Sequence, residues 1–329
     1  MMAETQQIWQ KIRDQKKSRM NIFSKLKKSN AGIGFIFAIL AAAFSALPNV
    51  IPKAVMIEHV ANEATPNPLM LVFVIYVINS LLFTPFRKSN KKRKTKSSKA
   101  TLMLLIMLGM AESAGTLSYT IGLEETTATN ASILVNSETI FAILLGVMIF
   151  REKIGKQELL PFFLIVVGSI IIPVASDVYN NNLELADFMM GDLLVVLSGF
   201  FYCLDTFIAK KLEDSVKTRH IVHVMSCTGA VMTLGLMLLF QIPFDISLEE
   251  VSVMSIVGFL GIGVTMVFFV SALRLLGAVR TVLIYSTTTV FSIVYSTVIL
   301  SESITIMNIV SSGSVLIGLF VLRNRISAE

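Results

Sequence analysis

The sequence predicts an all-α integral membrane protein with ten transmembrane helices arranged as two inverted five-helix repeats. Three observations predict this fold: an apolar composition, an alternation of charge between loops, and an internal repeat. The chain is 54% hydrophobic and only 15% charged, whereas soluble domains have about 45–50% apolar and about 25% charged residues. Lipid is therefore expected to be its main solvent.

Lysine and arginine gather on alternate sides of the apolar segments. All of the 28 except Lys53 fall in six clusters, at residues 1–30, 87–99, 151–156, 210–219, 274–280 and 323–325. The loops between these clusters carry acids such as Glu124, Asp187 and Glu302 and no base. Because short basic loops stay cytoplasmic, both termini and every basic loop are predicted to face the cytoplasm of a multi-pass cell-membrane protein.

Ten apolar segments have about the 18–25 residues that a helix needs to cross a hydrocarbon core about 30 Å thick. They lie near residues 31–54, 68–86, 101–122, 127–149, 157–175, 189–209, 221–240, 252–273, 279–299 and 304–323. The runs are continuously apolar rather than alternating, which argues against transmembrane strands.

The second half of the chain repeats the first at an offset of 150 positions. Thr139 then coincides with Thr289, Phe141 with Phe291, Glu152 with Glu302 and Gly168 with Gly318. Five spans per half place the second copy upside down, which is the usual architecture of secondary transporters. The predicted organisation is a basic cytoplasmic arm (1–30), a first repeat (31–175), an outer linker (176–190), a second repeat (191–323) and a cytoplasmic tail (324–329).

The fourth segment of each repeat carries a family-like pattern. It reads Ser137-Glu138-Thr139-Ile140-Phe141 with Arg151-Glu152 in the first half, and Thr287-Thr288-Thr289-Val290-Phe291 with Ser301-Glu302 in the second. This pattern resembles the EamA-type branch of the drug/metabolite transporter superfamily, whose fourth helix commonly reads L-E-P-V-F before an apolar run ending in G-E. The resemblance implies solute transport, since members include exporters of amino acids and other metabolites. The family's proline is replaced by Thr139 and Thr289, and its usual tryptophan in the first helix is missing, with Phe44 nearby.

Ionisable side chains at bilayer depth cost about 2.5–3.5 kcal/mol on insertion scales and therefore mark pathways or packed partners. Four are predicted within the spans, namely Glu112, Glu138, Asp205 and Lys53. Helical spacing joins the three acids to polar stripes, because residues at i, i+4 and i+7 share a helix face. The stripes are Glu112, Thr116 and Tyr119; Thr129, Ser132, Asn136 and Thr139 beside Glu138; Ser198, Tyr202 and Asp205; and Tyr285, Thr288, Ser292 and Ser296. We predict that these four stripes line one solute path.

Each of these residues also has a structural interpretation. Serine and threonine stripes can hold helices together, and Glu138 can serve either a buried hydrogen bond or proton coupling or amine binding. Asp205 can belong to a charge cluster with Lys210 and Lys211. Lys53 can extend to the outer headgroups.

Two further features have helix-end interpretations. Asn49 lies between Pro48 and Pro52, which suggests a broken or kinked helix whose freed backbone groups could meet a solute. Glu152 and Glu302 lie at turns between spans and are read as caps of the next helix.

The favoured function is a secondary transporter, with export as the favoured direction, that moves a small metabolite, amino acid or drug-like solute by alternating access. A membrane-embedded enzyme, with Glu112 and Glu138 as an acid/base pair, and a passive pore are the alternatives. No G-x-x-x-x-G-K-[ST] loop occurs, so the sequence does not support ATP-driven pumping. We expect no catalytic residues, no cofactor, no metal site and no nucleic-acid partner. The expected partners are the solute and anionic lipid at the basic loops, with a homodimer left open.

Overall fold

The structure, a computed structural model, describes residues 30–57, 67–84, 99–126, 128–148, 155–156, 159–168 and 190–326. Every long regular element in these ranges is a helix. The predicted basic arm up to residue 29, the basic tract up to residue 98, Glu152 and the predicted outer linker up to residue 189 lie outside the described residues.

Within the part of the chain that the structure describes, six stretches are long and apolar enough to cross a membrane. They are Asn30–Ile57, α3 (Lys99–Glu125), α8 (Met190–Leu212), α9 (Thr218–Leu239), the continuous run of α10 (Leu248–Ile256), η4 (Val257–Val264) and α11 (Thr265–Leu276), and the run Ala278–Leu300. Shorter apolar helices are α2 (Pro68–Leu82), α6 (Leu159–Val166) and part of α14 (Ile306–Ile326). Each coincides with a predicted span, although α6 covers only part of the segment expected over 157–175.

Two segments expected as single helices are each broken in two, and this corrects the sequence-based expectation. The segment 127–149 forms α4 (Ala128–Leu134) and α5 (Ser137–Met148), and the segment 279–299 forms α12 (Ala278–Tyr285) and α13 (Thr288–Leu300). At both breaks, side chains compete for backbone carbonyls, which weakens the helical ladder. Asn136 Nδ2 donates to Ser132 O at 2.8 Å, Ser286 Oγ to Val282 O at 3.1 Å and Thr287 Oγ1 to Ile284 O at 2.8 Å. The breaks therefore form without the proline of the family pattern.

The first helix, Asn30–Ile57, stays helical through Pro48 and Pro52 instead of breaking there. Gly261 of η4 makes room for it, since a Cβ at that position would lie 2.5 Å from Pro48 Cδ. The π-helical turn of η4 is the irregular element at this depth, and such turns often accompany functional sites. The irregular backbone at this depth thus occurs in η4, which packs against the first helix, and the first helix itself continues unbroken.

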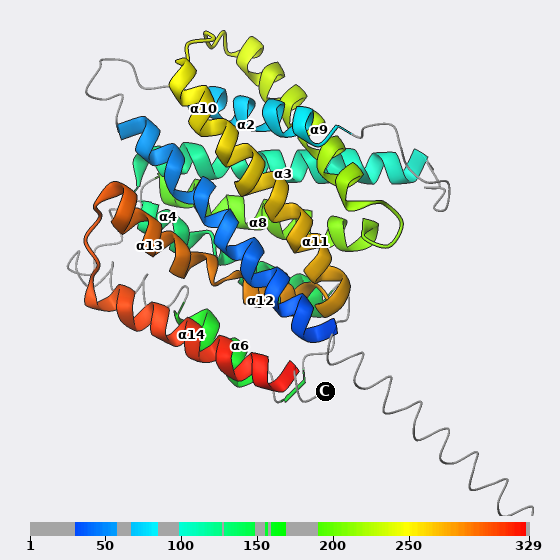
Figure 1. The fold of residues 1–329 in the computed structure, drawn as a ribbon, viewed down its shortest axis with the longest axis vertical. Helices are drawn as coiled ribbons and strands as arrows, with labels where there is room; N and C mark the ends of the chain where they lie inside the picture. Colours follow the sequence, from blue (N-terminus) through cyan, green and yellow to red (C-terminus); the bar gives the residue numbers. More distant parts are fainter. Residues whose placement is uncertain are drawn as a thin grey trace, which may run out of the picture.

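The helices pack in pairs drawn from both halves of the chain. Helix α3 lies along α8, α2 along α9, and α6 against α14, while α4 contacts α13 and α5 contacts α12. Figure 1 shows the first helix crossing the front of this bundle, with α6 and α14 together at its lower edge. At the α6–α14 contact, a Cβ on Gly168 would lie 2.8 Å from Ser311 O, and a Cβ on Gly318 2.8 Å from Ile165 Cγ1. Both glycines thus allow close helix approach.

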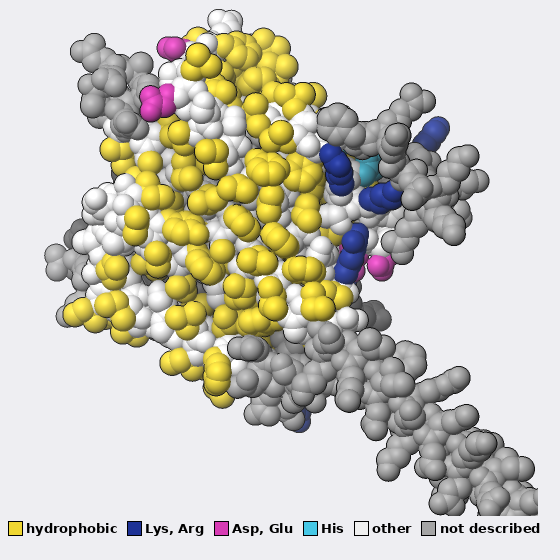
Figure 2. Space-filling model, in the orientation of Figure 1, with side chains coloured by type: hydrophobic (Ala, Val, Ile, Leu, Met, Phe, Trp, Pro, Cys, Tyr) yellow, Lys and Arg dark blue, Asp and Glu magenta, His cyan; other side chains and the backbone are white. Residues whose placement is uncertain are grey.

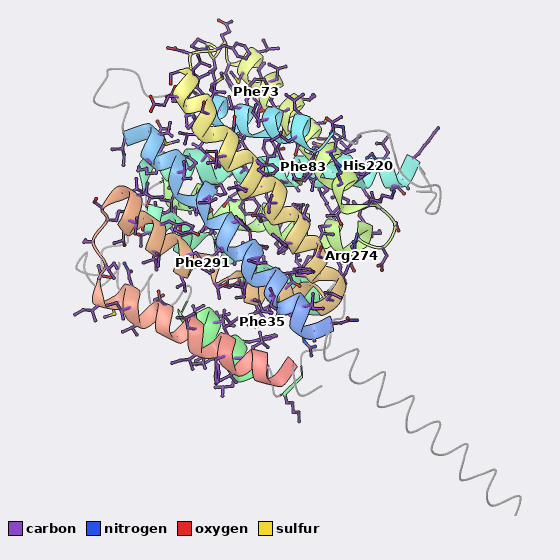
Figure 3. All side chains as sticks on the ribbon, viewed as in Figure 1. Phe35, Phe73, Phe83, His220, Arg274 and Phe291 are labelled. Carbon is purple, nitrogen blue, oxygen red and sulfur yellow. The ribbon has the colours of Figure 1, made fainter. Side chains whose placement is uncertain are left out.

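The surface is apolar around the sides of the bundle and charged toward its ends. Figure 2 shows a face covered by hydrophobic side chains, with lysine and arginine at one edge and acidic groups at the opposite upper edge. Arg274 and His220 mark the basic edge in Figure 3. Side chains such as Phe163 and Phe320 are 64% and 61% exposed, which suits contact with lipid rather than water.

Candidate functional site

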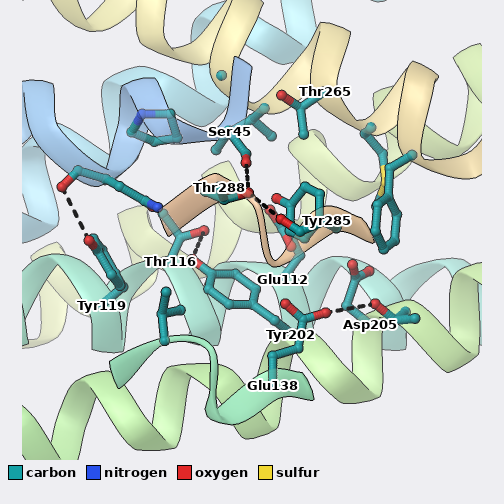
Figure 4. A pocket seen from close by; sticks show the side chains of 18 of the residues that line it. Ser45, Glu112, Thr116, Tyr119, Glu138, Tyr202, Asp205, Thr265, Tyr285 and Thr288 are labelled. Atoms are coloured by element: carbon teal, nitrogen blue, oxygen red, sulfur yellow. Dashed lines mark hydrogen bonds between the residues drawn. The ribbon is translucent and has the colours of Figure 1, made fainter. Parts of the chain in front are cut away.

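A cavity lies inside the bundle. Its empty space, including the part that is open to solvent, is about 950 Å³. Its wall is formed by the first helix, α3, α8, the η4–α11 run and the two helix breaks, with a small contribution from α2. Figure 4 shows polar side chains from these elements pointing toward a common space.

Of the residues predicted from the polar stripes, the intramembrane charges and the suggested helix break, eleven line this cavity. They are Asn49, Glu112, Thr116, Tyr119, Asn136, Glu138, Thr139, Tyr202, Asp205, Tyr285 and Thr288. Ser292 lies behind the wall, where its Oγ accepts a hydrogen bond from Asn49 Nδ2 at 3.3 Å. Lys53 and the stripe residues Thr129, Ser132, Ser198 and Ser296 also lie outside the wall. The helical spacing in the sequence therefore identified which faces turn inward.

Lys53 caps a helix end. Its Nζ donates to Leu123 O at 2.9 Å and to Glu124 O at 3.0 Å, at the end of α3. In the second half, Lys210 Nζ donates to Leu273 O at 2.9 Å, and Leu273 is 150 positions after Leu123. A cation stabilises the negative end of a helix dipole, so both lysines have a structural role.

Three carboxylates from three helices face the cavity: Glu112 of α3, Glu138 in the first turn of α5, and Asp205 of α8. Thr206 Oγ1 donates to Glu138 Oε1 at 3.1 Å. Within the described part of the chain, Asp205 forms no ion pair with Lys210 or Lys211, and Lys210 pairs with Glu213 at 2.6 Å. Among the described residues, no lysine, arginine or histidine side chain contributes to the wall.

The first turn of α5 is held tightly against α8. A Cβ on Gly199 of α8 would lie 2.8 Å from the backbone nitrogen of Glu138 and would collide with Ser137 Oγ. Ser137 Oγ donates to Val196 O at 3.2 Å. The missing side chain at Gly199 thus sets the position of Glu138 against Thr206.

The two helix breaks contact each other through a matched pair of hydrogen bonds. Asn136 Nδ2 donates to Thr289 Oγ1, and Thr139 Oγ1 shares a hydrogen bond of 2.6 Å with Ser286 Oγ. Ser286 follows Asn136 by 150 positions, and Thr289 follows Thr139 by the same offset. All four side chains are buried. The two breaks therefore contact each other through equivalent positions of the repeat.

Tyrosines of the wall are fixed by hydroxyl contacts. Tyr202 OH donates to Thr116 Oγ1 at 3.3 Å, and Tyr119 OH donates to Asn49 O at 3.1 Å. Tyr285 packs edge-to-face on Phe269, with ring centroids 4.9 Å apart. These contacts hold three aromatic side chains at the cavity surface.

Sequence reasoning missed several wall residues. Ser45 and Thr206 lie four positions from the predicted Asn49 and Tyr202, so the same helical spacing would have found them. Phe269, Met266 and Ile262 gave no signal, because an apolar residue in an apolar helix looks alike whether it faces lipid, core or cavity.

Glu302 caps a different helix from the one expected. The prediction was the next helix, yet Glu302 Oε1 accepts from Ala128 N at 3.1 Å and Oε2 from Thr129 N at 3.2 Å, at the start of α4. The chain leaves α13 through Ser301 in a left-handed conformation, with φ 56°. This turn directs Glu302 to a helix of the other half.

Comparison with known proteins gives a consistent result. An uncharacterized transporter of Methanothermobacter thermautotrophicus is 27% identical over 303 residues, covering 88% of this chain and 85% of that protein. One of Archaeoglobus fulgidus is 28% identical over 153 residues, covering 44% of this chain and 49% of that protein. A solved crystal structure with 14% identity has a similar fold, with a TM-score of 0.62 over 89% of this chain and 96% of its own. The profile of the EamA-like transporter family matches twice, at residues 32–173 and 189–324. The chain belongs to the EamA-like transporter family.

Proposed function

We propose that the chain is a secondary transporter that exports a small metabolite, amino acid or drug-like solute by alternating access. The observation that carries this proposal is the meeting of two broken helices at one polar cavity. Interrupted helices in corresponding positions of two halves are a recurrent feature of transporter binding sites. Here the interruptions are 135–136 and 286–287, on either side of the matched hydrogen bonds.

The proposed architecture is ten spans in two inverted repeats, 31–175 and 191–323, joined by the linker 176–190. The family profile matching once in each half supports a duplication. The pairs Asn136–Thr289 and Thr139–Ser286, related by the 150-position offset, support a two-fold axis between the breaks. The loop charges support a cell-membrane orientation with the arm 1–30, the tail 324–329 and the basic loops at the cytoplasmic leaflet, in contact with anionic lipid.

In the proposed cycle the halves rock about the crossing of the breaks and expose the cavity to one side at a time. The Glu302 cap on α4 and the Lys53 contact with α3 are bonds between separate helices at one end of the bundle. Lys210 and Arg274 make equivalent contacts at the other end, to Leu273 O and Glu213 O. One chain supplies the whole cavity, so the cycle needs no second copy even where a homodimer forms.

Flux in sealed proteoliposomes tests the proposal. A panel of radiolabelled amino acids and amines would be measured with and without an imposed pH gradient. We expect saturable accumulation that depends on the gradient and is lost in Glu138→Gln. Glu249→Gln is the matched control, since Glu249 is exposed on α10 and remote from the wall. Flux without saturation or gradient dependence would indicate a pore, and no flux across the panel would contradict the proposal.

A further inference from the structure

The wall of the cavity has an unbalanced set of ionisable groups. Glu112, Glu138 and Asp205 come from three different helices, and electrostatic interactions link Asp205 with both glutamates. Three described basic side chains outside the wall already have partners. Lys53 and Lys210 donate to backbone carbonyls, and Arg274 donates to Glu213 O. Buried acids without a cation must be neutralised by protons or by a positively charged ligand.

Asp205 is the wall carboxylate with a fully buried oxygen that has no hydrogen-bond donor among the described residues. It is 5% exposed, and its Oδ1 accepts no hydrogen bond from the described residues. It nevertheless lines the cavity (Figure 4). Glu138, by contrast, is already bonded to Thr206 at 3.1 Å. A buried, unsatisfied carboxylate oxygen is costly and requires an explanation such as a missing ligand.

The surroundings of Asp205 indicate what kind of ligand fits. An anionic group would meet repulsion from three acids without a compensating base in the described wall. A metal ion is disfavoured, because the described residues contain no group of three His, Cys, Asp or Glu side chains able to hold one. Tyr202, Tyr285 and Phe269 add ring faces that attract cations. Ile75, Ile262, Met266 and Val282 complete the wall with apolar surface.

We infer that the cavity binds the protonated amine of a small amphipathic solute, an inference that rests on the proposed transport function. The ammonium N–H donates to the Asp205 carboxylate, and Glu112 supplies a second negative charge. The aromatic rings and the aliphatic side chains hold the apolar body of the solute. The partnered Glu138 lies beside this pair and completes the acidic surroundings.

Binding to purified full-length protein in detergent tests this inference with probes that share one body. The probes are 2-phenylethylamine, the neutral 2-phenylethanol, the anionic phenylacetate and the zwitterion L-phenylalanine. We expect the amine to raise the melting temperature and to give saturable binding by calorimetry, and the alcohol and phenylacetate to do neither. Equal or tighter binding of phenylacetate, phenylethanol or L-phenylalanine would overturn the inference, as would failure of the amine to bind at all.

Variants localise the binding. Removing one partner of a buried charge pair has a large effect, so Asp205→Asn is expected to weaken amine binding by at least about thirtyfold. Glu112→Gln should have a smaller effect, because its charge acts without a direct hydrogen bond in this arrangement. Asp214→Asn, an exposed position just after α8, is the control and should bind like the parent. Unchanged binding by Asp205→Asn with a native melting temperature would remove Asp205 from the site.

The two proposals fail differently. Transport of anions or neutral solutes in proteoliposomes, with no amine binding, would leave the transport function and overturn the amine site. Amine binding that depends on Asp205, with no flux of any amine, would contradict transport and leave a binding site.

Discussion

The two helix breaks share their framework and differ in their chemistry. Residues 138 and 288 occupy the same place at the start of α5 and α13, yet one is a glutamate and the other a threonine. Glu138 accepts from Thr206 of α8 at 3.1 Å, while Thr288 shares a hydrogen bond of 3.0 Å with Ser45 of the first helix. Each break is therefore bonded to a hydroxyl on a helix of the other half.

This difference separates the features that occur in both repeats from those that occur in only one. The contacts between the breaks occur as a matched pair, whereas the acids occur once: the positions 150 after Glu112 and Glu138 are Ile262 and Thr288. A symmetric framework suits two equivalent open states. In the proposed cycle, carboxylates that the repeat does not match would give a bound solute one favoured orientation.

The largest expected effect comes from removing the charge that distinguishes the breaks. Glu138→Gln should reduce gradient-driven accumulation more than tenfold, on the order of 1.4 kcal/mol or more, while Thr288→Val should change it only slightly. Initial rates in proteoliposomes with and without a pH gradient would measure both. Equal losses in the two variants would mean that the asymmetry of the breaks has no functional role.

The next effect concerns the close approach that positions Glu138. Gly199→Ala places a methyl group against Ser137 and the Glu138 backbone, and such overpacking costs about 1–3 kcal/mol. Gly235→Ala in α9 is the control, because a Cβ there meets nothing within 4 Å. Thermal unfolding in detergent would compare the two variants. A native melting temperature and native transport in Gly199→Ala would show that the contact is not needed.

The matched hydrogen bonds should be similar in energy. Hydrogen bonds between membrane helices contribute about 0.6 kcal/mol on average and up to about 1.7. Double-mutant cycles with Asn136→Ala and Thr289→Val, and with Thr139→Val and Ser286→Ala, would give each coupling energy from unfolding in detergent. We expect two values that agree within about 0.5 kcal/mol. A large coupling energy for one pair and none for the other would mean that the two pairs match in sequence and geometry but not in energy.

The smallest expected effect is at the lysine caps. Lys53→Gln should lower stability by about 0.3–1 kcal/mol, the usual contribution of a cation at a helix C-terminus, and leave transport close to the parent. Lys210→Gln should cost more, because it also removes the 2.6 Å contact with Glu213. Denaturation in detergent and flux assays would measure both. Loss of transport by Lys53→Gln in a stable protein would return Lys53 to the functional site.

Helical spacing was sufficient to identify most of the polar side chains of the cavity wall. Glu112, Thr116 and Tyr119 recur at the period of a helix, and a polar face in an apolar helix has to avoid lipid. Predicted residues that lie outside the wall show the limit of this criterion. Ser292 and Lys53 satisfy the same periodicity, but one hydrogen-bonds behind the wall and the other reaches the end of α3.

The sequence by itself determined that the chain is helical and apolar and which helix faces are polar, because composition and periodicity are local properties. Only the tertiary structure decided that α4–α5 and α12–α13 are broken, that Glu302 caps α4, and that Lys210 pairs with Glu213 rather than Asp205. Those outcomes depend on hydrogen bonds between residues more than a hundred positions apart and on competition within a single helical turn. Neither leaves a periodic pattern in the sequence.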